Sequence, residues 1–125
     1  MKIDRQKVYE KYDKHCAYCG VLLMDIKDMQ VDHKEPLRRI FRYDSEKRKY
    51  VDTNKMKFPQ NQTFENCMPS CRVCNHYKSD MSLEQFRERM ITIHERIKDR
   101  YIYKVAITYG IIVINPFDGK FYFEK

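Results

Sequence analysis

Two pairs of cysteines constrain the fold of this chain more than any other feature of its sequence. Cys16 and Cys19 form one C-x-x-C pair, and Cys71 and Cys74 form a second pair much further along the chain. Two intervening residues let both sulfurs of a pair reach one metal from a tight turn, and two such turns complete a tetrahedral S₄ site. We therefore expect a closed structural zinc that joins the N-terminal turn to the segment near Cys74. A closed site of this kind leaves no coordination position for catalysis.

The fifth cysteine, Cys67, lies outside both pairs. In a reducing cytosol, the C-x-x-C spacing favours zinc over disulfide bonds. Cys67 falls in an expected strand, where a cysteine without a metal usually acts as a small buried hydrophobe.

The length of the chain indicates one domain with a modest core. The 125 residues fit a single domain over 1–125, with a core at about 14–80 and an extension at about 81–125. In a domain of this size a structural metal contributes noticeably to stability. No stretch approaches the roughly 18 apolar residues of a membrane helix, and the N-terminus is charged rather than a signal peptide. We expect a cytoplasmic protein without membrane contact.

The excess positive charge is concentrated in one segment. The chain carries a net charge of +7, and residues 34–57 hold nine Lys/Arg against four Asp/Glu. Such a concentration is expected of a surface that faces phosphates. Charge alone is explained equally well by a solvated basic loop.

The first half of the chain predicts short elements around the two turns. Residues 2–13 are expected to form a short helix, and 15–20 a tight turn that presents Cys16 and Cys19. Strands are expected at Val21–Met24, Met29–Asp32 and 63–68, the first two as neighbours and the third closed by Pro69. Residues 38–63 lack an apolar period and predict a polar loop insertion with at most a short helix.

The second half of the chain predicts helices. Cys71–Ser79 is expected to run from the second turn into a short helix. Ser82 stands at an N-cap position with Gln85 at the capping-box position, and apolar residues at spacings of three and four predict a helix over 83–99. A second helix over 101–109 is expected to end at Gly110, and two β-rich runs around the turn at 115–119 predict a short terminal hairpin.

Two segments together carry groups suited to phosphodiester hydrolysis. The reaction requires a base that deprotonates water and a cation that stabilises the scissile phosphate. Asp32 offers a hard oxygen ligand, and His33 offers an imidazole that titrates near neutral pH. Asn66 and Asn75 add amides that can orient or coordinate, and Lys78 is placed to meet a phosphate. His76 should be turned away from Asn75 by a helical step of about 100°.

These residues stand in an order that resembles the HNH endonucleases. The pattern is C-x-x-C, then an apolar residue followed by Asp-His-x-x-Pro-Leu, then Asn-x-x-Pro-x-Cys-x-x-Cys-Asn-x-x-Lys, over about residues 16–80. The later region is similar to small HNH proteins of phages and Gram-positive bacteria. The resemblance implies an α+β fold: a ββα-metal core with a four-cysteine zinc, flanked by the N-terminal helix and by a C-terminal helical region that ends in a short β-hairpin.

The resemblance also implies a role for each matching residue. His33 would be the general base, and Asp32 and Asn75 would hold a catalytic divalent metal, Mg²⁺ or Mn²⁺. Asn66 would fix the loop that bears the base. The contacts to DNA are expected from five basic residues: Lys34, Arg38, Arg39, Arg42 and Lys78.

The expected function is thus metal-dependent hydrolysis of double-stranded DNA by a monomer or homodimer, in the cytoplasm of a bacterium or of a phage-infected host. A zinc-stabilised nucleic-acid-binding module without catalysis is the main alternative, and an adaptor that docks through its long apolar helix is a third. The sequence leaves open nicking or double-strand cleavage, site preference, and a role in restriction, homing, packaging or defence.

Overall fold

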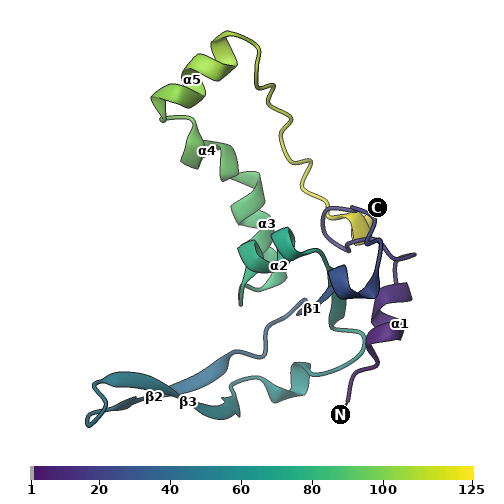
Figure 1. Cartoon of the computed structure of the whole chain (residues 1–125), viewed down its shortest axis with the longest axis vertical. Coiled ribbons are helices and arrows are strands. Elements are labelled where there is room, and N and C mark those ends of the chain that lie inside the picture. Colours follow the sequence, from purple (N-terminus) through teal and green to yellow (C-terminus); the bar gives the residue numbers. More distant parts are fainter. Residues whose placement is uncertain (1) are drawn as a thin grey trace.

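The computed structural model describes residues 2–125 and shows an α+β protein with two small antiparallel sheets (Figure 1). The helices in this range are α1 (Arg5–Glu10), α2 (Arg72–Lys78), α3 (Leu83–Ile91), α4 (Ile93–Ile97) and α5 (Tyr101–Thr108). The strands are β1 (Gln30–His33), β2 (Arg39–Asp44), β3 (Lys49–Met56) and β4 (Cys67–Ser70), and short 3₁₀ turns lie at Ile26–Asp28, Pro59–Asn61 and Tyr122–Glu124.

The N-terminal helix is shorter than predicted. Asp4 caps α1 by accepting hydrogen bonds from the backbone N–H groups of Gln6 and Lys7. The helix ends at Glu10, before Asp13 and Lys14, both of which adopt positive φ angles. A left-handed backbone at these positions is incompatible with a continuing right-handed helix. The turn that follows delivers the chain to the first cysteine pair, as expected.

The central sheet pairs strands that are far apart in the sequence. β1 runs antiparallel to β4, with Asp32 opposite Met68 and His33 opposite Cys67. The predicted pairing of Val21–Met24 with Met29–Asp32 is therefore wrong. The reason is that Val21–Met24 is tied to the first cysteine turn, where the Leu23 N–H donates to the carbonyl of Lys14.

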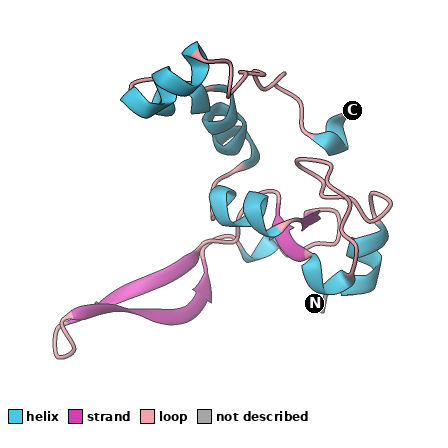
Figure 2. Cartoon of the chain, turned by 45° about the horizontal axis from the view of Figure 1, so that its top comes forward, coloured by secondary structure: helices cyan, strands magenta, loops and turns pink. Residues whose placement is uncertain are grey.

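The fourth strand includes Pro69 instead of ending before it. Pro69 has no N–H to donate, yet its carbonyl accepts a hydrogen bond of 2.8 Å from the N–H of Ala17. All four residues of β4 are buried. The short helix α2 follows directly, as predicted, so two antiparallel strands and a helix form the centre of the protein (Figure 2).

The core consists of two clusters on either side of this centre. One surrounds Phe86 and Phe121, whose rings stack 4.9 Å apart, and also contains Cys16 and Tyr18. The other lies under α1 and is formed by Val8, Tyr9, Leu23, Met29 and Cys67.

The basic insertion is a β-hairpin, and the prediction of a polar loop with a short helix is wrong. β2 pairs with β3 in antiparallel register, with Tyr43 opposite Tyr50. The residues of both strands are exposed or half-buried. The sequence therefore lacks the apolar alternation that marks a strand with one buried face. In Figure 1 the hairpin projects away from the body of the protein.

The predicted helix over 83–99 is divided into α3 and α4. Its start is as expected, because Ser82 and Gln85 form a capping box. Thr92 interrupts it with φ −100° and ψ 9°, and its hydroxyl donates to the carbonyl of Glu88. A threonine hydroxyl bonded to the preceding turn commonly bends a helix. The next helix, α5, ends before Gly110 at φ +70°, as predicted.

The predicted terminal β-hairpin is wrong. The chain after Gly110 returns to the body, where Phe121 is buried and Tyr122–Glu124 forms a 3₁₀ turn (Figure 1). The N–H of Tyr122 donates to the carbonyl of Tyr18, and the N–H of Phe123 donates to the carbonyl of Ala17. Backbone hydrogen bonds to the first cysteine turn and burial of Phe121 thus replace a local hairpin.

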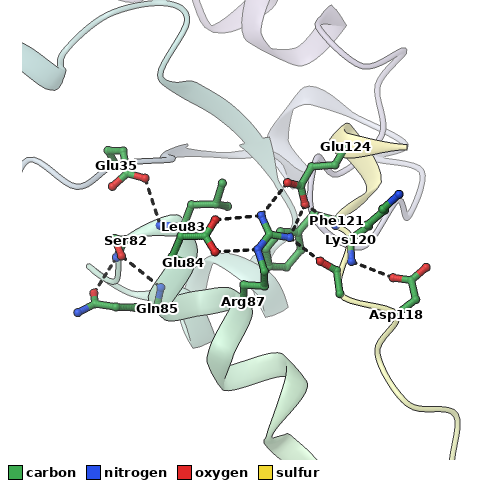
Figure 3. A network of polar contacts seen from close by, with 11 residues as sticks. Glu35, Ser82, Leu83, Glu84, Gln85, Arg87, Asp118, Lys120, Phe121 and Glu124 are labelled. Atoms are coloured by element: carbon green, nitrogen blue, oxygen red, sulfur yellow. Dashed lines mark hydrogen bonds and ion pairs between the residues drawn. The ribbon is translucent and has the colours of Figure 1, made fainter.

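Arg87 fixes the C-terminal segment to α3, as Figure 3 shows. Its guanidinium donates two hydrogen bonds of 2.6 Å to the carboxylate of Glu124 and also binds Glu84. It lies 5.1 Å from the centre of the Phe121 ring. The hydrogen bonds from Arg87 lower the pKa of Glu124.

We expect the Arg87–Glu124 contact to stabilise the protein at pH values above the pKa of the Glu124 carboxyl, but not below it. Because the folded-state pKa of Glu124 is depressed, this stabilisation is complete above the ordinary value of 4.5 and disappears as the pH falls through the folded-state pKa. Glu124→Gln should cost about 1 kcal/mol of unfolding free energy near neutral pH, as for a well-formed but partly exposed pair. Urea denaturation of wild type and variant over a pH series measures the difference.

The matched control is Glu88→Gln, which alters an exposed carboxyl on α3, the helix that carries Arg87. Its effect should stay small at every pH. A Glu124→Gln penalty that persists undiminished in acid would show that the carboxylate charge is not what binds Arg87.

Within residues 2–125, no helix combines the length and apolar character needed to cross a membrane.

Candidate metal cluster and candidate active site

The two cysteine pairs meet in space, as the sequence predicts. Cys16 and Cys19 come from the N-terminal turn, whereas Cys71 is the N-cap of α2 and Cys74 lies in its first turn. The four Sγ atoms all lie within 4.8 Å of one another, and those of Cys19 and Cys71 are 3.7 Å apart. Four sulfurs bound tetrahedrally at about 2.3 Å from zinc stand roughly 3.8 Å apart. The cluster could therefore hold a metal ion such as zinc.

Contacts among these thiols shift the pKa values of Cys16 and Cys74 in opposite directions. The thiols of Cys19 and Cys74 donate hydrogen bonds to the sulfur of Cys16 and hold its pKa well below the usual range. The same contacts raise the pKa of Cys74. Because metal binding replaces the protons of such thiols, the affinity of this cluster for a metal should fall as the pH falls.

Cys67 lies in the cluster under α1, apart from the four cysteines that meet. Its side chain is fully buried, and this burial raises the pKa of its thiol. The position agrees with the predicted role of a small buried hydrophobe.

Asp32, His33 and Asn75 line one cavity of about 480 Å³. Asp32 and His33 end β1, and Asn75 comes from the middle of α2. Neighbours on a regular strand point to opposite faces, yet the consecutive residues Val31, Asp32 and His33 all contribute to the lining of this cavity. The rest of the lining comes mostly from the segment that leads into the hairpin: Pro36, Leu37, Arg38, Arg39 and Phe41.

Asp32 is held by two buried partners. Its Oδ2 atom lies 3.0 Å from the Nζ of Lys78 and accepts a hydrogen bond from the hydroxyl of Tyr18. Burial raises the pKa of Asp32, while the ammonium and the hydroxyl oppose that rise. Burial and the neighbouring carboxylate raise the pKa of Tyr18, so its hydroxyl remains a donor. These contacts fix one carboxylate oxygen and orient the whole group.

Lys78, predicted to contact a phosphate, is instead buried inside the protein. The Lys78 side chain is fully buried, and its ammonium donates a 2.8 Å hydrogen bond to the backbone carbonyl of His33 in addition to pairing with Asp32. A buried ammonium is retained because it has a charged partner and hydrogen-bond acceptors. Lys78 therefore holds both Asp32 and the backbone of His33.

His33 is oriented by a residue that the sequence does not single out. Its Nε2 atom shares a hydrogen bond with Oε1 of Gln62. With the Gln62 oxygen as the acceptor, the imidazole donates from Nε2, and Nδ1 is then the ring nitrogen without a proton. The sequence places Gln62 in a polar loop, and only the folded chain brings that loop beside β1.

Asn66 joins two loops beside the cavity. Its side-chain oxygen accepts a hydrogen bond of 2.9 Å from the N–H of Glu35, and its amide group donates to the carbonyls of Glu35 and Asn61. Its backbone carbonyl accepts from the N–H of Lys34. Asn66 thus fixes the segment directly after His33.

The remaining basic residues of the predicted DNA-contacting set have different surroundings. Arg38 donates to the side chain of Gln85, and Arg39 pairs with Asp52 at 2.9 Å; both line the cavity. Arg42 is exposed on β2. The ammonium of Lys34 lies 6.0 Å from the centre of the Phe123 ring, on the side of the C-terminal segment.

Comparison of the chain with protein-family models, with curated proteins and with solved structures finds no match. Its function is therefore inferred from the residues themselves and from their arrangement.

Proposed function

We propose that the protein is a metal-dependent DNA endonuclease with an HNH active site. The observation that carries the proposal is the cavity that Asp32, His33 and Asn75 line together, with Arg38 and Arg39 at its edge. These groups offer a base, two oxygen ligands and positive charge, which phosphodiester hydrolysis requires. β1, β4 and α2 have the order and the antiparallel pairing of a ββα core.

His33 takes a proton from the attacking water in this mechanism. The Gln62 contact leaves Nδ1 free to accept that proton, and Asn66 fixes the backbone that follows the base. Lys78 holds the carbonyl of His33. Three contacts thus restrain His33: one to its ring, one to its own carbonyl and one to the segment that follows it. A general base needs such a fixed orientation.

Asp32 and Asn75 fit a catalytic divalent metal by the chemistry of their donor atoms. Mg²⁺ and Mn²⁺ prefer oxygen ligands, and magnesium sites commonly combine one or two carboxylates with phosphate and water. One Asp32 oxygen is occupied by Lys78 and Tyr18, which leaves the second oxygen to serve as a ligand. A metal held there would stabilise charge on the scissile phosphate and on the leaving 3′-oxygen.

The four-cysteine cluster fits a structural zinc in the same proposal. All four sulfurs lie within 4.8 Å of one another, close enough to share one ion, and four sulfurs would leave no open position. The zinc would fix the N-cap of α2, the helix that carries Asn75 and Lys78. It would thereby position part of the active site without touching the substrate.

Cleavage of supercoiled plasmid DNA tests the proposal. Zinc-loaded wild-type protein should nick or cut the plasmid with Mg²⁺ or Mn²⁺, and His33→Ala should reduce the rate by at least about a hundredfold, the usual loss when a general base is removed. His76→Ala is the matched control, because His76 is exposed on α2 and outside the cavity lining. It should retain cleavage.

The opposite results would each have a definite meaning. Wild-type protein that binds the plasmid but never cuts it would favour a zinc-stabilised binding module. Equal cleavage by wild type and His33→Ala would exclude His33 as the base. Loss of cleavage in His76→Ala alone would move the site to the other face of α2.

A further inference from the structure

The β2–β3 hairpin forms an arm that extends from the active-site cavity. The two strands pair from Arg39 opposite Met56 to Asp44 opposite Lys49, and the hairpin projects from the body in both views (Figures 1 and 2). A lone two-stranded hairpin is marginally stable in water. The contact between the rings of Tyr43 and Tyr50, 5.3 Å apart, stabilises its outer half.

The arm carries most of the excess positive charge of the protein. Residues 39–57 hold seven Lys/Arg against three Asp/Glu, a surplus of four in a chain with a net charge of +7. Two of the three acidic groups have partners within the hairpin. Asp52 pairs with Arg39, and Asp44 accepts hydrogen bonds from backbone N–H groups of the turn. The outward charge is therefore positive, as expected of a surface that follows phosphates.

Aromatic side chains are exposed between these basic residues. Phe41 and Tyr43 are each 55% exposed, and Tyr50 is 71% exposed. Arg42 lies between the first two in the sequence and, on a strand, points to the opposite face of the hairpin. Both faces thus present groups that can contact sugars, bases or phosphates, and a ribbon with two such faces suits a groove better than a flat surface.

The base of the arm is part of the wall of the candidate active site. Arg39, Phe41 and Met56 line the same cavity as Asp32 and His33. A nucleic acid held along the arm would therefore have its backbone beside the catalytic groups.

The dimensions of the arm favour one class of nucleic acid. The major groove of B-form DNA, about 12 Å wide, admits a two-stranded β-ribbon. Double-stranded RNA has a deep and narrow major groove that such a ribbon does not enter. A strand of six residues spans roughly 20 Å at about 3.3 Å per residue, which is enough to follow the groove past several base pairs.

We infer that the β2–β3 hairpin is a binding arm that seats in the major groove of double-stranded DNA and directs the adjacent phosphate to the active-site cavity. The second part of this inference, that the phosphate reaches a catalytic site, rests on the proposed nuclease function. The binding itself does not depend on cleavage, so the two can be tested separately.

The test removes charge from the arm and, in a control, from another part of the surface. The arm variant is Arg42→Gln with Arg48→Gln and Lys49→Gln. The control variant removes three exposed positive charges from the α4–α5 region: Lys98→Gln, Arg100→Gln and Lys104→Gln. Circular dichroism and zinc content verify the fold of both. Binding is measured by fluorescence anisotropy with duplex DNA, with one of its strands and with duplex RNA of the same sequence.

The arm variant should bind duplex DNA at least about tenfold more weakly. Its plot of log affinity against log salt should become shallower, by about one in slope for each phosphate that the arm no longer neutralises. The control variant should change affinity less than about threefold. Wild type should prefer duplex DNA over both other probes.

If both variants lost DNA affinity equally, the attraction would be generally electrostatic, and the inference that the hairpin is a binding arm would be wrong. A preference for single strands or for duplex RNA would overturn the groove assignment. An arm variant that binds as wild type does, while wild type cleaves plasmid, would reject the arm and keep the nuclease. If duplex binding depended on the arm but no cleavage occurred, the inference of a binding arm would hold and the proposed nuclease function would be wrong.

Discussion

Removal of metal from the four-cysteine cluster is expected to unfold the protein. The cluster joins the N-terminal turn to the start of α2, and Cys16 is itself part of the core around Phe86. Structural zinc contributes roughly 10 kcal/mol or more to folding in small zinc domains, whereas whole domains are stable by only about 5–15 kcal/mol. Titration with a strong chelator should abolish the helical circular-dichroism signal, and one equivalent of zinc should restore it.

Two cysteine substitutions distinguish the contribution of metal binding to stability from that of core packing. Cys74→Ser should lose the metal and the fold together. Cys67→Ala, which alters a buried cysteine outside the cluster, should retain one zinc per chain and cost only about 1 kcal/mol. Metal analysis and urea denaturation measure both effects. A Cys74→Ser protein that remains folded without metal would show that core packing alone holds the N-terminal turn.

The convergence of the cysteine pairs was predictable because spacing limits what a local turn can do. Two residues between Cys16 and Cys19 allow one geometry for joint metal binding, and the same holds for the second pair. Asp32, His33 and Asn75 were predicted from the order of the motifs, not from the cysteine spacing, and all three line one cavity. The four-cysteine cluster includes the N-cap of α2, the helix that carries Asn75, and Asp32 and His33 lie on the strand that contacts this helix.

The wrong strand pairing and the wrong terminal hairpin depend on contacts between distant segments. β1 pairs with β4 because the intervening residues 38–63 leave the body as a hairpin, and no local pattern encodes that choice. The hairpin itself has no buried face, so apolar alternation could not reveal it. Phe121 docks against Phe86 instead of forming a terminal hairpin, which only the shape of the core determines.

The role of Lys78 could not be predicted for a related reason. A lysine one helical turn after the last cysteine of such a pair is exposed in most settings, because burial of an ammonium is costly. Here the buried carboxylate of Asp32 and the carbonyl of His33 compensate for that cost. The pair becomes evident only when β1 and α2 are placed together.

Lys78→Met is expected to destabilise the protein by about 3–5 kcal/mol, the usual cost of leaving one member of a buried ion pair unpaired. Methionine keeps an unbranched side chain, one atom shorter, but removes the charge and the hydrogen bond to His33. The pKa of Asp32, already raised by burial, should rise further without the ammonium. Urea denaturation gives the free energy, and plasmid cleavage should also disappear, since Asp32 and His33 are no longer held.

A second substitution distinguishes the ion pair from simple packing. Asp32→Asn combined with Lys78→Met removes both charges and should recover most of the stability but no cleavage. Lys34→Met, a half-buried lysine beside Phe123, serves as the control and should cost no more than about 1 kcal/mol. If Lys78→Met instead kept full stability and reduced only DNA affinity, the lysine would be a phosphate contact, and its burial beside Asp32 would have to be released when DNA binds.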